Sequence, residues 1–400
     1  MNSNKISVII PSFNFADSLE RVLLGLKNQT VQDFEIIIVD SSSDHEVHKV
    51  VNSSNFSNIS IQYLKVDRAF PGEARNIGTN QARGEYLAFL DSKTVPKENW
   101  LELGMKALEN EKKDVVFGVT EYKSKTSFQR ILQAATFGKI GHETTPGSII
   151  KKSFYSKSCY FIEGVRTADD LFWRKNLKFK NLDWKTPSEV TLTYSELPDN
   201  YWEILKRYFI YSWHTARVSV QNNMKDLYFG ILLILSALIV PRWNSLVGWE
   251  ESFLYIPNVT KVYLLVIFFI FLLNLIFRTV FPNENDKNSF LWFSLKSIIF
   301  IALIASTYRW NEIVAGWIEQ SPLYFPHITK IYLASILGLS ILIRGVYMPI
   351  KRKVELDFIF PFKWFLIGLV GVGLDLAKAP GYAFGALVSP FLSNKEELNQ

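Results

Sequence analysis

SVIIPSFN at residues 7–14 and QDFEIIIVDSSSD at residues 32–44 decide the fold. Each stretch is a series of aliphatic residues that ends in polar residues, at Asn14 and at Asp40. A third run, YLAFLD, ends in the same way at Asp91. Apolar strands without alternation are buried on both faces, which is typical of parallel sheets.

Stretches with helical periodicity separate these strands. Aliphatic residues recur at helical spacing between Asp17 and Leu26. A short helix is expected at residues 74–82, and Pro96 is expected to open a helix through Leu108, because proline suits a first helical turn. We predict an α/β fold in which a Rossmann-like, parallel-centred sheet carries helices on both faces. The expected strands are residues 6–10, 34–39, 59–66, 86–90 and 115–119.

The polar residues at the strand ends predict a binding site. In open α/β sheets, ligands bind beyond the carboxyl ends of the parallel strands. Residues 11–14, Asp40 and Asp91 all occupy such positions. One of them alone is as well explained as a loop residue that caps a strand, but the coincidence of three favours a shared site.

Taken in order, SVIIPSFN, QDFEIIIVDSSSD and ARNIGTNQARGEYLAFLDS (residues 74–92) resemble the consecutive motifs of the family 2 inverting glycosyltransferases. The resemblance covers roughly residues 5–200. It implies the GT-A fold and a nucleotide-sugar donor held across the strand ends. A sugar would then pass from that donor to an acceptor with inversion at the anomeric carbon.

The resemblance also implies a role for each residue at the strand ends. Phe13 and Asn14 would border the base and ribose, and Asp40 would hydrogen-bond the base. Arg75 and Asn76 would line the floor of the donor site. The implied nucleotide-sugar-binding residues are Pro11, Phe13, Asn14, Asp40, Arg75, Asn76, Asp91 and Lys93.

The expected metal motif is altered in this chain. The family usually carries Asp-x-Asp, whose second acid binds Mg²⁺ or Mn²⁺, whereas this chain has Asp91-Ser92-Lys93. A departing diphosphate needs nearby positive charge. Lys93 could supply that charge without a metal, or it could point away while Asp91 and other oxygens hold an ion, or transfer activity could be lost. The metal-free mechanism is slightly favoured.

The stretch FIEGVRTADDLFWR at residues 161–174 resembles the acidic pair on the family's acceptor side. The resemblance makes Asp170 the base that takes the acceptor's proton, with Asp169 beside it. Both are therefore named as catalytic residues. The alternative is that Asp169 caps a helix and Asp170 is a first-turn charge. Arg166 and Arg174 are candidates for phosphate contact or for pairing with an acid.

The second half of the chain is predicted to lie in a membrane. Hydrophobic residues make up 48% of the sequence, which is high for a soluble enzyme, and they concentrate after Asp226. Five apolar stretches approach the length of a membrane span. They cover residues 227–240, 262–281, 290–307, 331–348 and 358–376. The predicted organisation is a glycosyltransferase domain at 1–200, an interfacial amphipathic segment at 201–222, a transmembrane region at 223–393 and a polar tail at 394–400.

Two segments of the membrane half are copies of each other. RWNSLVGWEESFLYIPNVTKVY occupies residues 242–263, and RWNEIVAGWIEQSPLYFPHITKIY occupies residues 309–332. Their tryptophan, tyrosine and charged residues are typical of a membrane interface. The basic loop at 351–353 is expected on the cytoplasmic side together with the N-terminal domain, and the two copies on the opposite side. We therefore expect an integral protein of the inner or plasma membrane.

These features predict transfer of a sugar to a lipid-borne acceptor, such as a polyprenyl phosphate, a lipid-linked saccharide or a glycolipid. The expected partners are a nucleotide-sugar donor, that acceptor and membrane lipids, but no nucleic acid, because no run of basic residues occurs. The alternative is a transporter or flippase with a degenerate sugar-nucleotide-binding domain. The Gln-x-x-Arg-Trp motif of processive synthases is absent after the acidic pair. The chain also lacks the glycine-rich loop of nucleotidyltransferases.

Overall fold

The computed structural model describes residues 5–155, 159–180, 182–218, 239, 242–259, 262, 263, 265 and 328–392. The strands are β1 (Ile6–Ser12), β2 (Phe34–Asp40), β3 (Ile61–Lys65), β4 (Tyr86–Phe89), β5 (Thr94–Pro96), β6 (Val115–Tyr122), β7 (His142–Lys151), β8 (Trp184–Lys185) and β9 (Leu192–Tyr194). The helices of the sheet domain are α1 (Ala16–Lys27), α2 (Glu46–Val51), α3 (Pro71–Gln81), α4 (Trp100–Glu109), α5 (Ser127–Thr136) and α6 (Asp169–Phe179). The later helices are α7 (Tyr201–Arg217), α9 (Trp243–Val247), α13 (Ile328–Leu342), the π-turn η7 (Ile343–Tyr347), α14 (Met348–Lys351), α15 (Leu356–Ile359) and α16 (Lys363–Leu392).

All the described strands belong to one sheet, in the order β3-β2-β1-β4-β7-β6-β9-β5, with β8 paired to β6. β1 runs parallel to β2 and β4, and β2 runs parallel to β3. β7 is antiparallel to both β4 and β6, whereas β9 is parallel to β6 and antiparallel to β5. The predicted parallel-centred α/β sheet is confirmed, and its other half is mixed.

Pro96 does not open a helix, so that prediction is wrong. It ends β5, where it pairs with Leu192 of β9, and α4 begins four residues later at Trp100. The next residue, Lys97, donates its backbone N–H to Thr191 O over 2.9 Å. The strand forms because a partner almost a hundred residues away satisfies its backbone, and proline at a strand end removes no ladder bond.

Helices cover both faces of the sheet, as predicted. Ile6, Val8 and Ile10 of β1 point into one buried cluster, and Ile9 points into the other. The first cluster lies under α1, α2 and α4, and the second lies under α3 and α6. Because successive side chains of a strand face opposite sides, an uninterrupted apolar strand needs a helical layer on each face.

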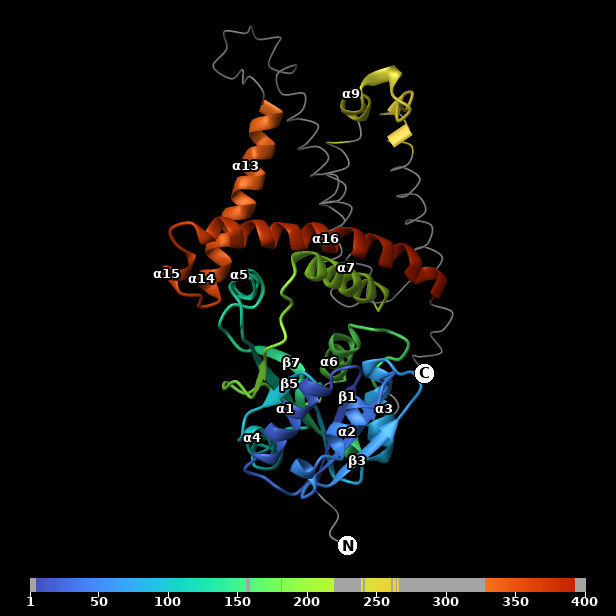
Figure 1. Cartoon of the computed structure of the whole chain (residues 1–400), viewed down its shortest axis with the longest axis vertical. Coiled ribbons are helices and arrows are strands. Elements are labelled where there is room, and N and C mark those ends of the chain that lie inside the picture. The colour runs from blue at the N-terminus through green and yellow to red at the C-terminus, as the bar shows by residue number, and fades with distance from the viewer. Residues whose placement is uncertain are drawn as a thin grey trace.

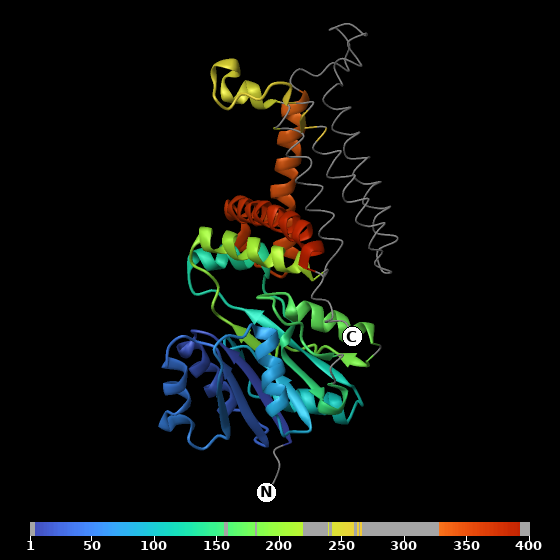
Figure 2. The same ribbon diagram turned by 90° about the vertical axis from the view of Figure 1, so that its right-hand side faces the viewer.

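A further helical layer, formed by α5, α7 and α16, lies over one end of the sheet (Figures 1 and 2). Leu132 of α5, Ile204 of α7 and Leu374 of α16 share one buried cluster. The basic loop after α14 joins this layer, because the Arg352 side chain donates to Ala135 O over 3.1 Å. Its carbonyl accepts the backbone N–H of Lys139 over 2.9 Å. The basic loop therefore lies against the sheet domain.

Glycines allow α16 to lie lengthwise on α7. A Cβ added to Gly381 would clash with Phe209 O, and one added to Gly385 would clash with Trp213 O. The helix begins at Lys363 and continues without a break to Leu392. Within the described part of the chain, its residues Lys363–Gly385 form the one helix long and apolar enough to cross a membrane, by length and composition only.

The orientation of α16 differs from that of α13. Figure 1 shows α16 running across the long axis of the molecule, whereas α13 runs along it. The two helical segments cross at glycines, since a Cβ on Gly345 would clash with Trp364 O and one on Gly368 would clash with Ile341 O. The expected fourth and fifth apolar stretches are thus both helical, but they do not lie side by side.

The first repeat copy folds into a small unit at the end of the molecule away from the sheet (Figure 1). The Trp243 indole donates to Leu254 O over 2.8 Å, and the Asn244 amide donates to Ile256 O over 2.8 Å. The Trp-Asn pair of the repeat therefore closes this turn. That the copies and the sheet domain lie on opposite sides of a membrane remains a prediction.

Several predicted segments fall outside the described residues. Apart from a few positions, these include the apolar stretches at 227–240, 262–281 and 290–307 and the second repeat copy up to residue 327. The tail at 394–400 lies outside them entirely. The interfacial segment is described as far as Val218 and is helical as α7.

Gly381→Val should weaken the packing of α16 on α7. A side chain at this position meets backbone, so we expect a loss of about 1–3 kcal/mol, the usual cost of overpacking. Gly338→Val on α13 is the control, because no atom of the described residues lies within 4 Å of a Cβ there. Thermal unfolding of the full chain in detergent should show a lower midpoint for Gly381→Val. Equal midpoints for both variants would contradict the packing described above.

Candidate functional site

The ends of β1, β2 and β4 lie next to one another, because these strands are neighbours in the order β2-β1-β4. Pro11 is buried within β1, while Phe13 follows the strand and is 53% exposed. Asn14 adopts a left-handed conformation with φ of 57°, which asparagine tolerates better than most residues. Its backbone N–H donates to Ser42 Oγ over 2.7 Å. The loops after β1 and β2 are thereby joined.

Asp40 is completely buried at the end of β2, and its carboxylate is saturated. Oδ1 accepts the hydroxyl of Ser42 over 2.5 Å and the backbone N–H of Ser42 over 3.0 Å. Oδ2 accepts the Tyr63 hydroxyl over 2.7 Å and Lys65 Nζ over 3.1 Å. Burial tends to raise the pKa of Asp40, but these hydrogen bonds outweigh it and hold the pKa below its ordinary value. Asp40 therefore organises the loop at this strand end.

Asp91 follows β4 in a tight turn. Thr94 Oγ1 accepts the backbone N–H of Asp91 over 3.1 Å, and the Thr94 N–H donates to Asp91 O over 3.0 Å. The Asp91 carboxylate itself has only a 3.5 Å contact with Ser92 Oγ in the described part of the chain. Lys93 Nζ lies 3.2 Å from the ring centroid of Phe15, the residue before α1. The turn thus presents a carboxylate and an ammonium beside each other.

Arg75 and Asn76, on consecutive positions of α3, hold the segment that leads into α6. Arg75 Nη1 donates to Asp169 Oδ2 over 2.6 Å, and both side chains are about 5% exposed or less. Asn76 Nδ2 donates to Phe161 O over 2.9 Å, and its Oδ1 accepts the Phe161 N–H over 3.0 Å. Both side chains are buried and bound to protein groups, so they fix the position of the segment that carries the acidic pair.

The two acids of the pair have different surroundings. Asp169 is buried at the start of α6, and burial raises its pKa although Arg75 opposes this. Asp170 is only partly buried, and its carboxylate makes no hydrogen bond or ion pair with any described residue. The residue before the pair, Ala168, has φ of 72°, a costly conformation for a residue with a Cβ. This strained backbone directs one acid inward and leaves the other available.

Asp91 and Asp170 are close enough to act on the same tyrosines. Burial raises the pKa of Tyr122 to about 12, and the charges of Asp170 and Asp91 add to this rise. Burial also raises the pKa of Tyr211 on α7, with the same two carboxylates contributing. The donor-side turn, the acidic pair and α7 therefore surround one region. Arg166 also acts on Tyr211, whereas Arg174 pairs with Glu143 over 3.0 Å.

Three groups of site residues were not predicted from the sequence. Phe15 lies directly after the first motif, so its proximity to the strand ends could be predicted from the sequence. Its contact with Lys93 could not. Tyr63 and Lys65 lie on β3, and the parallel pairing of β3 with β2 could have placed Lys65 opposite Asp40. Tyr211 comes from α7, which the sequence predicts as an interfacial amphipathic segment next to the enzyme domain but not as a source of site residues.

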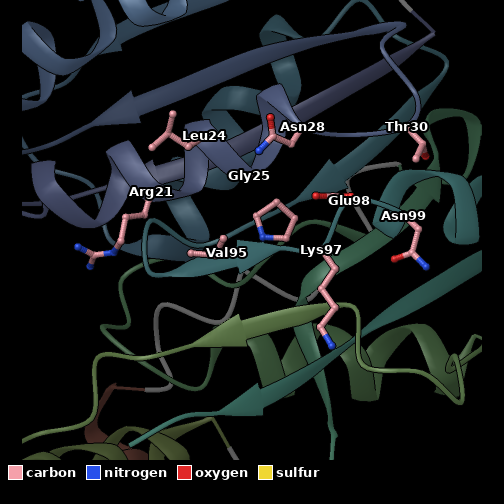
Figure 3. A pocket seen from close by; sticks show the side chains of 10 residues that line it. Arg21, Leu24, Gly25, Asn28, Thr30, Val95, Lys97, Glu98 and Asn99 are labelled. Atoms are coloured by element: carbon pink, nitrogen blue, oxygen red, sulfur yellow. The ribbon is translucent and has the colours of Figure 1, made fainter. Parts of the chain in front are cut away.

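A separate hollow lies between α1 and the segment that joins β5 to α4 (Figure 3). Figure 3 shows Leu24, Val95 and Lys97 around it. None of the predicted site residues lines it. It is an open surface feature and does not form part of the site described above.

Sequence comparison now adds to this geometry. Residues 7–166 match the family model described as glycosyl transferase family 2. This part of the chain is therefore a glycosyltransferase domain, as the resemblance predicted. The match includes the strand ends, Arg75, Asn76 and the turn at Asp91, but it stops short of the acidic pair.

Individual relatives carry the same description. An uncharacterized glycosyltransferase of Methanocaldococcus jannaschii is 25% identical over 260 residues, which are 60% of this chain and 88% of that protein. The GalNAc(5)-diNAcBac-PP-undecaprenol beta-1,3-glucosyltransferase of Campylobacter jejuni is 35% identical over 89 residues, which are 22% of this chain and 29% of that protein. Several other curated relatives are matched over only 20% to 40% of their own length.

Among solved structures, the mannosyltransferase PcManGT from Pyrobaculum calidifontis, in complex with GDP-Man and Mn²⁺, is similar to this chain. The two share 15% sequence identity with a TM-score of 0.47. The similarity covers 93% of this chain and 86% of that one.

Arg75→Ala should destabilise the folded chain strongly. The variant leaves the Asp169 carboxylate buried without its partner, and loss of one member of a buried pair costs about 3–5 kcal/mol. Arg83→Ala is the control, because that side chain is 70% exposed although it also pairs with a buried acid, Glu35. Thermal unfolding of the full chain should separate the two variants clearly. A loss below about 1 kcal/mol for Arg75→Ala would show that the pair does not hold the segment.

Asp40→Asn should alter the acid stability of the protein. Since the folded-state pKa of Asp40 is lowered, the ionised carboxylate stabilises the fold above its unfolded pKa, which is about 3.9. That contribution is lost as the pH falls through the lower folded-state value. The unfolding midpoint of wild type should therefore fall more steeply below about pH 4 than that of Asp40→Asn. Asp17→Asn, an exposed position on α1, should follow wild type.

Proposed function

We propose that this protein transfers a sugar, with inversion, from a nucleotide-sugar donor to a lipid-borne acceptor. The observation that carries this proposal is the contrast within the acidic pair. Asp169 is held in a buried ion pair with Arg75, whereas the Asp170 carboxylate lacks a partner among the described residues and, like Asp91, raises the pKa of the buried Tyr122. An acid that is held in place but unpaired is suited to act as a general base.

The proposed reaction uses few groups. The acceptor hydroxyl attacks the anomeric carbon of the sugar, and the bond from that carbon to the diphosphate oxygen breaks. Its electron pair stays on the departing diphosphate, and the acceptor's proton passes to the Asp170 carboxylate. Attack from the side opposite the leaving group inverts the anomeric carbon. Asp91 and the loops after β1 and β2 would hold the nucleotide part of the donor.

The helical layer supports an acceptor at a membrane surface. Trp202 on α7 is 74% exposed, and α16 and the turn before it carry several exposed apolar side chains. Exposed lysines lie beside this layer at 351, 353 and 363. The exposed apolar residues of α16 and the preceding turn are Phe362, Phe365, Leu366, Leu369, Leu376 and Phe384. Apolar side chains beside cations suit the boundary between head groups and acyl chains.

We infer that α7 and α16 lie along this boundary while α13 enters the bilayer, with the glycosyltransferase domain on the cytoplasmic side. The crossing of α13 and α16 favours this arrangement (Figure 1). The name of the Campylobacter jejuni relative includes a PP-undecaprenol compound, which is consistent with a lipid-linked acceptor for this chain.

The direct test of this function uses membranes that contain the full chain. They are incubated with a panel of radiolabelled nucleotide sugars, and the lipid fraction is then extracted. Label from one donor should appear in the lipid fraction and should depend on the protein. Label that appears only in water-soluble products would exclude the lipid acceptor. Nucleotide binding without any transfer would favour the transporter or flippase with a degenerate sugar-nucleotide-binding domain.

Asp170→Asn should reduce turnover by about a hundredfold to ten-thousandfold, the usual effect of losing a general base. Binding of the donor nucleotide should persist, because the strand-end loops are unchanged. Asp114→Asn is the control. Asp114 directly precedes β6, at the end of the strand away from Tyr122, and its carboxylate accepts the backbone N–H of Asp183. Turnover near the wild-type value in Asp170→Asn would show that another group takes the proton.

A further inference from the structure

We propose that Lys93, held on the aromatic face of Phe15, binds the donor diphosphate in place of a divalent metal ion. This inference rests on the proposed function, because it concerns the donor site of the same reaction. It assigns a binding role to Lys93 and a positioning role to Phe15.

The geometry of the pair is the first observation. Lys93 Nζ lies 3.2 Å from the ring centroid of Phe15, which is a close cation–π contact. Phe15 is 39% exposed, so the ring is anchored at the start of α1 but still borders open space. Lys93 forms no ion pair with any described carboxylate. An ammonium held by a ring face keeps its full charge and its hydrogen-bond donors for a ligand.

The electrostatic surroundings of Lys93 are the second observation. Burial lowers the pKa of Lys93, and the neighbouring Asp91 opposes this effect. The charges of Arg207 and Glu203 on α7 and of Glu196 also reach it. A partly dehydrated ammonium gains more from an anionic ligand than a fully hydrated one does. A diphosphate that enters beside Asp91 would restore the interactions that Lys93 has lost to burial.

The donor set is the third observation, and it does not fit a metal held by the protein. Mg²⁺ in such sites is usually bound by one or two carboxylates together with substrate phosphates. Here Asp91 is followed by Ser92 and Lys93, so an approaching divalent cation would meet an ammonium. Among the described residues, no group of three histidine, cysteine or acidic side chains could hold a metal.

The ammonium would act at the step where the glycosidic bond breaks. As the bond between the anomeric carbon and the diphosphate oxygen breaks, its electron pair goes to that oxygen and the diphosphate gains one negative charge. Lys93 offsets this charge through hydrogen bonds and remains protonated. The acceptor's proton goes to Asp170, so no further reactant is required.

The first experiment measures nucleotide binding by the full chain in detergent, with UDP and GDP as probes and with excess chelator. We expect at least one of the two to bind under these conditions, and added Mg²⁺ or Mn²⁺ to change its affinity by less than about twofold. Lys93→Ala should weaken binding by about tenfold, because charge-assisted bonds to phosphate are lost. Lys97→Ala, which changes a lysine at the separate hollow, should leave the affinity unchanged.

The second experiment tests the positioning role of Phe15. Phe15→Leu should weaken nucleotide binding by about threefold, the scale of an exposed cation–π contact, and Phe15→Tyr should retain it. In the Lys93→Ala background, Phe15→Leu should have no additional effect, which a merely structural role would not produce. Phe179→Leu, at a position that is 72% exposed on α6, is the matched control.

Two results would overturn the proposal. One is nucleotide binding that chelator abolishes and Mn²⁺ restores. The other is an effect of Phe15→Leu that is the same with and without Lys93. Failure of the proposed function is distinguishable from both. Absence of sugar transfer with Lys93-dependent nucleotide binding would reject the function alone, whereas transfer that requires Mn²⁺ would reject only the lysine.

Discussion

The buried ion pair between Arg75 and Asp169 is the constraint on which the site depends. Two charges that are almost fully removed from water must satisfy each other, so they fix the separation of α3 and α6. Arg75 also packs against the Phe161 ring, 5.1 Å from its centroid, and Asn76 binds the backbone of Phe161. Because Asp170 directly follows Asp169, the Arg75–Asp169 ion pair also fixes the position of Asp170.

The interactions that define the site explain what could be predicted from the sequence. The apolar strands and their polar ends are local patterns, so the parallel half of the sheet and the strand-end residues were readable. The Arg75–Asp169 bond joins residues 94 positions apart, and β5 pairs with β9 across a similar distance. Such pairings leave no periodicity, which is why the sequence wrongly predicts a helix from Pro96 and does not predict the pairing of Arg75 with Asp169.

The orientation of α16 shows a different limit of sequence reasoning. Hydropathy reports that a helix is apolar, and it gives the same value whether the helix crosses a bilayer or lies along its surface. Packing adds what hydropathy does not report, because Gly381 and Gly385 allow the α7 backbone to approach α16 along its length. Since α7 also borders the site through Tyr211, these glycine contacts fix the distance between the site and α16.

The charge at the donor turn has a physical consequence for the reaction. A divalent ion carries twice the charge of an ammonium and holds its ligands in a defined geometry, whereas a lysine has a flexible stem. The Phe15 ring face reduces the conformational freedom of the lysine without neutralising its charge. A carboxylate partner would neutralise that charge. The single charge attracts the diphosphate less strongly than a metal would, both before and after the bond breaks. A site built in this way binds donor and product more weakly, but its charge does not depend on metal occupancy.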